Sequence, residues 1–252
     1  MSLATPFNIL GEPLIELPLV ESTNIYAIAQ IRDGQAISGS AYFTDFQTKG
    51  KGQMGKFWES EIGQNILVSY VLNWETALFT NSFGLSVAVS LGVYDFLREI
   101  AGEETSIKWP NDLYWRDRKA VGILIENLLR GTQINWSIIG IGINVNQTQF
   151  SAEVPNPVSL KQMTGKTFDR KQLVKQLSEK IQVQLQLYLK GEAEAQLSRY
   201  NAHLYKKNRV QKFKSGTRIF EATIIEVNKE GQLILATGMQ EAFNFGTLQW
   251  MQ

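Results

Sequence analysis

The feature that most constrains the fold is a series of strand-like segments around one apolar helix, between residues 66 and 145. Residues 66–72 (ILVSYVL) form a short apolar run, which is typical of a buried strand. Residues 82–102 have apolar side chains at helical spacing, with Ser82 placed to cap the helix and Gly102 placed to end it. Three more strands are expected at 106–109, 120–127 and 134–145, with residues 110–119 as a turn after the first. This order predicts a mixed α/β domain of roughly 200 residues.

Further elements are expected on both sides of this segment. Strands are predicted at 14–20 and 36–46, and the helix between them begins at Ser22 or Thr23, either of which suits an N-cap. Asp169 stands where a long amphipathic helix begins, with apolar residues along one face.

The pattern changes at about residue 200. Short alternating strands separated by turns follow, which predicts a small all-β barrel. His203 lies just after the long helical region and is expected to be a surface or hinge residue.

The composition excludes several classes of chemistry. The 252 residues include no Cys, which excludes disulfides, thiolate zinc sites and a cysteine nucleophile. His203 is the only histidine, which excludes a multi-histidine metal site. The 25 basic and 24 acidic residues nearly balance, which argues against a nucleic-acid-binding module. No signal peptide or membrane span is apparent, so a cytoplasmic protein without a membrane partner is expected.

The loop from Gln47 to Trp58 alternates three glycines with lysines. Glycine permits close approach of backbone N–H groups to an anion, and lysine supplies neutralising charge. The loop lacks the pattern of a Walker A loop and the third glycine of a dinucleotide-binding fingerprint. Taken by itself, this composition also suits a flexible surface hairpin with solubilising lysines.

Two further segments place polar groups at the ends of predicted strands. In residues 108–112 (KWPND), Pro110 fixes a turn that holds an amide and a carboxylate where α/β sheets commonly bind ligands, although an ordinary β-turn has the same residues. Lys119 opens an apolar strand, from which it either enters a pocket or extends to solvent. Residues 140–144 (GIGIN) permit close approach of a ligand or of a neighbouring backbone.

Taken together, these segments resemble the biotin–protein ligases. The family's E-S-T-N, Gln-plus-glycine loop ending in Trp, K-W-P-N-D, R-K-x-x-G-I-L-x-E and G-x-G-I-N patterns occur here in the same order, over about residues 15–160. Lys51 and Gln53 stand where arginines are usual in the loop. The resemblance implies an α+β fold, with a mixed-sheet biotin/lipoate ligase-like catalytic domain over 1–197 and a small SH3-like β-barrel over 198–252. Only about twenty residues precede Ser22, so a ligase without a DNA-binding domain is expected.

The resemblance also implies a reaction. Family members join biotin to ATP, giving biotinyl-5′-adenylate and pyrophosphate, and then transfer biotin to a lysine of a biotin carboxyl carrier domain. The biotin carboxylate and the α-phosphate repel each other, so the site needs cations and converging N–H groups more than acid–base residues. By resemblance, Lys119 and Lys51 are the catalytic residues. Mg²⁺ is expected with ATP, held mainly by phosphates, with no metal site in the protein.

Binding roles follow from the same resemblance. The residues implied for biotin are Ser22, Thr23, Asn24, Gln47, Lys51, Gly52, Gln53, Lys119 and Gly122. Those implied for ATP and the adenylate are Lys51, Gln53, Trp58, Asn111, Asp112, Lys119 and Asn144.

Three alternatives remain at this point. A lipoate ligase or octanoyl transferase shares the fold, although the K-W-P-N-D segment and the Gly-Lys-Gly-Gln loop favour biotin. A non-catalytic binder of biotin or adenylate is the second, because two loop arginines are replaced. A nucleic-acid module is the third, and the near-zero net charge argues against it. The carrier protein is not identified by the sequence, and both a monomer and a homodimer remain open.

Overall fold

The computed structural model describes residues 7, 9–75 and 81–251. Its first sheet has seven strands: β1 (Leu14–Leu17), β2 (Ala41–Thr44), β3 (Ile66–Asn73), β4 (Thr105–Lys108), β5 (Asp112–Trp115), β6 (Arg118–Arg130) and β7 (Gln133–Ile143). Their spatial order is β1-β2-β3-β7-β6-β5-β4. Strands β1 and β2 are parallel and the other neighbours are antiparallel, so the sheet is mixed.

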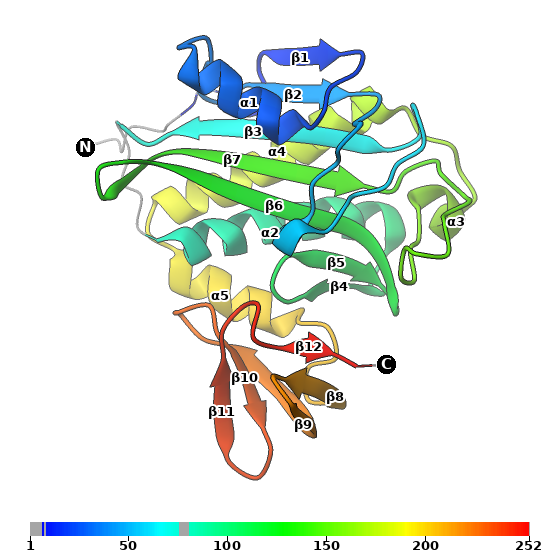
Figure 1. Ribbon diagram of the computed structural model, residues 1–252, viewed down its shortest axis with the longest axis vertical. Helices are drawn as coiled ribbons and strands as arrows, with labels where there is room; N and C mark the ends of the chain where they lie inside the picture. The colour runs from blue at the N-terminus through cyan, green and yellow to red at the C-terminus, as the bar shows by residue number, and fades with distance from the viewer. Residues whose placement is uncertain (1–6, 8, 76–80, 252) are drawn as a thin grey trace.

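Helices cover this sheet unequally. In Figure 1, helix α1 (Thr23–Arg32) lies in front of the sheet, whereas α2 (Ser82–Ala101) and α4 (Arg170–Leu189) lie behind it. Helix α3 (Leu160–Thr164) lies at one side, and α5 (Ala193–Ala202) lies below the sheet. Among the described residues no α-helix lies over the front face beyond α1, where the loop that carries the short 3-10 helix η1 (Gln53–Gly55) crosses.

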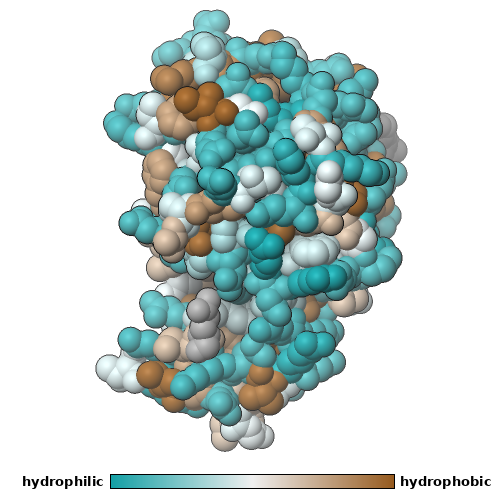
Figure 2. Space-filling view, turned by 90° about the vertical axis from the view of Figure 1, so that its right-hand side faces the viewer, coloured by the Kyte–Doolittle hydropathy of each residue, from teal (hydrophilic) through white to brown (hydrophobic). Residues whose placement is uncertain are grey.

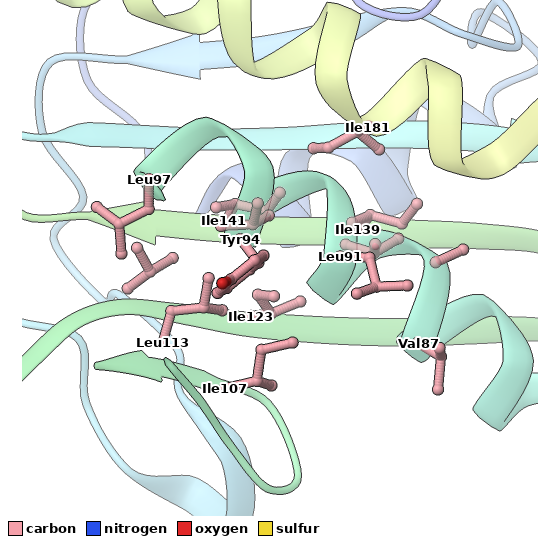
Figure 3. Packing of buried hydrophobic residues seen from close by; sticks show 14 of the residues in the cluster. Val87, Leu91, Tyr94, Leu97, Ile107, Leu113, Ile123, Ile139, Ile141 and Ile181 are labelled. Atoms are coloured by element: carbon pink, nitrogen blue, oxygen red, sulfur yellow. The ribbon is translucent and has the colours of Figure 1, made fainter. Parts of the chain in front are cut away.

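The apolar core lies between the sheet and α2. Side chains alternate along a strand, so Ile139 and Ile141 of β7 and Ile123 of β6 all point toward α2, where Leu91 and Tyr94 pack against them (Figure 3). Each fully buried side chain of this size contributes about 1.5–3 kcal/mol to folding. The side chains on this face of the sheet are therefore buried in the core, and the opposite face is available for a site.

Glycine allows α2 and α4 to pack closely. A Cβ at Gly92 of α2 would lie 2.6 Å from the Cα of Ile181 on α4, so a larger residue would push the helices apart. The predicted N-cap of α4 is confirmed, because Asp169 accepts hydrogen bonds from the N–H groups of Lys171 and Gln172.

The second sheet is antiparallel and follows α5. It comprises β8 (Val210–Ser215), β9 (Arg218–Val227), β10 (Leu233–Ala236), β11 (Gln240–Phe243) and β12 (Gln249–Trp250), in the order β11-β10-β9-β8-β12. A mixed sheet with helices followed by a small β-barrel-like domain confirms the expected fold class. The proposed boundary between residues 197 and 198 falls inside α5, whereas the first strand of the second sheet begins only at Val210.

Some local predictions are wrong. The predicted turn at 110–119 contains strand β5, whose four residues sit between two tight turns and leave too short a pattern to recognise. The N-cap of α2 is Asn81, which accepts a hydrogen bond from Gly84 N, and Ser82 is already helical. The strand expected at 36–46 is limited to Ala41–Thr44.

His203 is a half-buried contact residue, not a surface residue. Its ring stacks on Tyr94 with centroids 4.3 Å apart, and its Nδ1 lies 3.0 Å from the Tyr94 hydroxyl. Burial lowers the pKa of His203.

The surface in Figure 2 is largely hydrophilic, with apolar residues in small separate groups, and the molecule narrows where the two parts meet. Among the described helices, none is long and apolar enough to cross a bilayer.

Candidate functional site

A cavity opens on the front face of the sheet, beside the N-terminus of α1 and under the loop that follows Gln47. Its free volume is about 50 Å³, and the indole of Trp58 covers part of its floor. Eleven residues that the sequence predicts for the site line it: Ser22, Thr23, Asn24, Gln47, Lys51, Gly52, Gln53, Trp58, Asn111, Lys119 and Gly122.

Glycines form the floor of the cavity. Gly122 of β6 pairs directly with Gly142 of β7, and the indole of Trp58 lies over both. A Cβ at Gly122 would lie 2.7 Å from Cζ3 of Trp58, and a Cβ at Gly142 would overlap the same ring. Two residues back along β7, Gly140 makes equivalent room for the side chain of Asn24. The absent side chains thus create space for flat groups against the sheet.

The N-terminus of α1 holds Gln47 in one orientation. Ser22 occupies the N-cap, as predicted, but its side chain makes no capping hydrogen bond. Instead Thr23 donates to Gln47 Oε1 twice, from its backbone N at 2.7 Å and from its hydroxyl at 3.1 Å. The carbonyl oxygen of Gln47 is therefore occupied by Thr23, and its amide NH₂ is left to interact elsewhere.

Lys119 is directed into the site and not freely into solvent. Its Nζ lies 2.8 Å from Oδ1 of Asp112 and 5.5 Å from the centre of a Trp58 ring, and its side chain is only 28% exposed. Its backbone is tied to a neighbouring connection, since Lys119 N donates to Asn156 O and Val158 N donates to Lys119 O. A sheltered ammonium over the cavity floor can neutralise a bound anion.

Two polar atoms in the cavity have no hydrogen-bond partner. Oε1 of Gln53 and Nε1 of Trp58 are both buried without one. Leaving such a group unsatisfied costs about 1–3 kcal/mol. An acceptor beside Trp58 and a donor beside Gln53, both supplied by a ligand, would remove these costs.

The residues predicted for the nucleotide divide into two groups. Lys51, Gln53, Trp58, Asn111 and Lys119 line the cavity, and Asn111 is fixed by donating to Ile123 O at 2.6 Å. Asp112 does not line it but contacts it through its ion pair with Lys119. Asn144 is only 4% exposed, with its Nδ2 3.4 Å from Lys119 O, so its contact with the site also passes through Lys119. Nucleotide roles for these residues stay predictions.

Six lining residues were not assigned to the site from sequence: Leu67, Ile123, Leu124, Gly140, Ile141 and Gly142. Gly140 and Gly142 had been given no binding role, although residues 140–144 were expected to permit close approach of a ligand or of a neighbouring backbone. The period of two along strands also points to Leu124, which is two residues beyond Gly122. Leu67 lies in a continuously apolar strand, where nothing in the pattern distinguishes a site residue from a core residue.

The residues of segment 108–112 lie in two different environments. Lys108 points away from the cavity, with its Nζ 4.5 Å from the ring centre of Tyr114 and 4.8 Å from that of Trp250 in β12. Burial lowers the pKa of Lys108 to about 8. Trp109 donates to Gly231 O at 3.0 Å, which joins the two parts of the chain. Asn111 lines the site, and Asp112 reaches it through Lys119.

Among the described residues, no group of three or more His, Asp or Glu side chains is placed to hold a metal ion.

Comparison with known proteins places the chain in a family. Residues 16–144 match the model of the "Biotin/lipoate A/B protein ligase family". The chain is 33% identical over 186 residues to the bifunctional ligase/repressor BirA of Salmonella typhimurium, covering 73% of this chain and 57% of that protein. It is 30% identical over 227 residues to BirA of Escherichia coli, covering 89% and 70%. The chain thus spans 57% of the length of the first of these relatives and 70% of the length of the second.

A solved structure agrees with these sequence matches. The biotin protein ligase from Aquifex aeolicus in complex with biotin and ATP superposes with a TM-score of 0.81 at 26% identity, covering 96% of this chain and 99% of that one. The resemblance found in the motifs is confirmed. The chain belongs to the biotin/lipoate A/B protein ligase family, and within it to the biotin–protein ligases.

Proposed function

We propose that the chain is an ATP-dependent biotin–protein ligase that makes biotinyl-5′-adenylate and transfers the biotinyl group to a lysine of a biotin carboxyl carrier domain. The observation that carries this proposal is the order of groups along the cavity floor. The amide of Asn24 lies beside Gly140, and Thr23, its neighbour in sequence, is hydrogen-bonded to Gln47, whereas Lys119 lies beside Gly122 with its ammonium over the Trp58 ring. This order matches a ligand with a neutral polar ring at one end and a carboxylate at the other.

The chemistry suits these side chains. A carboxylate oxygen of biotin attacks the α-phosphorus of ATP and displaces pyrophosphate, and the carrier lysine then attacks the acyl carbon and displaces AMP. Lys119 and Lys51 offset the repulsion between carboxylate and phosphate, which is electrostatic stabilisation without proton transfer by a histidine. Gly52 and Gly122 carry no side chain, so an anion can approach the loop and the sheet closely at these two positions.

ATP is proposed to bind where the cavity meets Trp58 and Asn111. Trp58 offers an indole face for stacking and an unpartnered N–H, and Asn111, Asp112 and Asn144 lie around Lys119. Mg²⁺ is proposed to arrive with the triphosphate and to be held mainly by its oxygens and water, because a triphosphate itself offers oxygen ligands of the kind Mg²⁺ prefers.

The direct test is transfer of biotin to a carrier. The full chain, ATP, Mg²⁺ and biotin are incubated with a purified biotin carboxyl carrier domain, and labelling is followed by mass. We expect a single biotinyl addition that requires ATP. Lipoate and octanoate in place of biotin distinguish the related ligase and transferase. Binding of biotin without adenylate formation would favour the non-catalytic binder instead.

A further inference from the structure

A chain of buried hydrogen bonds leads out of the cavity to an acidic residue that does not line it. Nδ2 of Asn24 lies 2.7 Å from Oε2 of Glu126 on β6, and the Asn24 Oδ1 lies 2.5 Å from the hydroxyl of Ser69 on β3. The same Ser69 hydroxyl lies 2.6 Å from that of Thr23, which donates to Gln47. These hydrogen bonds connect four segments of the protein: β6, α1, β3 and the loop after β2.

The middle of this chain is closed to water. Exposure is 3% for Asn24, 0% for Ser69 and 4% for Thr23. Buried amides and hydroxyls need partners within the protein, so each group constrains the next. Gly140 contributes by leaving space for the amide of Asn24 against β7.

Glu126 supplies the shorter of two acceptors that set the direction of these hydrogen bonds. An ionised carboxylate and a backbone carbonyl only accept hydrogen bonds, so the Asn24 amide turns its NH₂ toward Glu126, and toward Leu124 O at 3.4 Å, and its oxygen toward Ser69. Ser69 shares its single hydrogen between the Asn24 oxygen and the Thr23 hydroxyl oxygen, and Thr23 donates to Oε1 of Gln47 from its hydroxyl and from its backbone N–H. The NH₂ of Gln47 is thereby left as a donor for a ligand.

We propose that Glu126 is a positioning residue for ligand recognition, because it fixes Asn24 and, through Ser69 and Thr23, the amide of Gln47 that receives the polar ring of biotin. The inference rests on the proposed function for the identity of the ligand. It predicts that Glu126 affects the binding of biotin and leaves the phosphate chemistry at Lys119 unchanged.

The test compares Glu126→Ala, Glu126→Gln and a control, Glu99→Ala, which removes an exposed carboxylate that pairs with Lys180. Biotin affinity is measured by titration, and KM for biotin, KM for ATP and kcat by adenylate formation. We expect Glu126→Ala to weaken biotin about tenfold, the scale of one lost hydrogen bond to a charged group, with KM for ATP and kcat within about twofold of the parent. Glu126→Gln should restore most of the affinity, because its amide oxygen still accepts from Asn24. Glu99→Ala should match the parent.

Ser69→Ala interrupts the same chain at its centre and keeps the test valid if Glu126→Ala fails to fold. It should also raise KM for biotin selectively. Unchanged biotin affinity in these variants, or equal changes in both KM values, would overturn the positioning role. Failure of the parent to bind biotin would instead overturn the proposed function, so the two failures are distinguishable.

Discussion

Gly122 and Gly142 are direct partners in the β6–β7 ladder, so the centre of the cavity floor carries no side chain. A single methyl group added there would meet the ring of Trp58, whose indole now covers the pair. A substitution at either glycine therefore changes the shape of the cavity without changing its charge.

Gly142→Ala should weaken biotin binding by at least tenfold, because the new methyl group either displaces Trp58 or occupies the space of the ligand. Gly92→Ala is the matched control, since its Cβ would lie 2.6 Å from the Ile181 backbone on the other face of the sheet. It should lower the free energy of unfolding by about 1–3 kcal/mol without changing biotin affinity in the folded protein. Titration with biotin and urea unfolding provide both measurements. Similar biotin affinities for the parent and Gly142→Ala would show that the floor does not contact the ligand.

Lys119→Ala should reduce the rate of adenylate formation about 10²–10³-fold, the usual effect of removing one oriented electrostatic donor. The variant also leaves Asp112 unpaired beside the cavity, which adds repulsion toward a phosphate. Lys229→Ala, at a side chain 86% exposed, is the charge-matched control. The measurement is single-turnover formation of biotinyl-adenylate. A parent-like rate in Lys119→Ala would remove this residue from the chemistry.

Gln53→Arg should slow release of biotinyl-adenylate by about one order of magnitude. The carbonyl oxygen of Gln53 is buried without a partner, and a guanidinium would replace it with several donors aimed at anionic oxygens. A hydrogen bond to a charged group contributes about 1.5–3 kcal/mol at most, which sets the scale. Gln53→Gly should speed release. If all three proteins release the adenylate at one rate, position 53 does not touch it.

Lys108→Met should change the pH dependence of stability. Burial lowers the pKa of Lys108 to about 8, so between pH 8 and about 10.5 the unfolded chain holds a proton that the folded chain has lost. The free energy of unfolding therefore contains a part that rises with pH across that window, by at most about 3 kcal/mol. The Lys108→Met variant lacks this pH-dependent part of the free energy of unfolding. Urea unfolding at pH 7.5, 9 and 10.5 measures it, with Lys229→Met as control, and parallel curves for parent and Lys108→Met would contradict it.

Much of the fold was readable because its strongest elements have long, regular patterns. Strands β3, β6 and β7 and helices α2 and α4 each combine sustained apolar content with clear ends, as at Asp169. Strand β5 has only four residues and begins with Asp112, so the local sequence favours a turn and only pairing with β4 and β6 makes it a strand.

The motif residues of the site could be predicted from the sequence, but the contacts that these residues make could not. The family resemblance assigned Lys119 to the site, but its pairing with Asp112 depends on the register of β5 and β6. The aromatic surroundings of Lys108 include Trp250, which is remote in sequence, and no local pattern carries such a contact. Leu67 was missed for the same reason, because its role depends on which face of β3 meets the loop.

The β3–β7 ladder joins residues 66–73 to residues 136–143, and it has a consequence for how the pocket comes into being during synthesis. A nascent chain that ends before β7 has the loop, the first helix and the N-terminal strands, yet it lacks half of the glycine floor. Pairings this distant in sequence close slowly, because loop entropy must be overcome before they form. Recognition of the ligand is therefore a late event in folding, and once the sheet has closed, biotin would stabilise the finished protein by mass action.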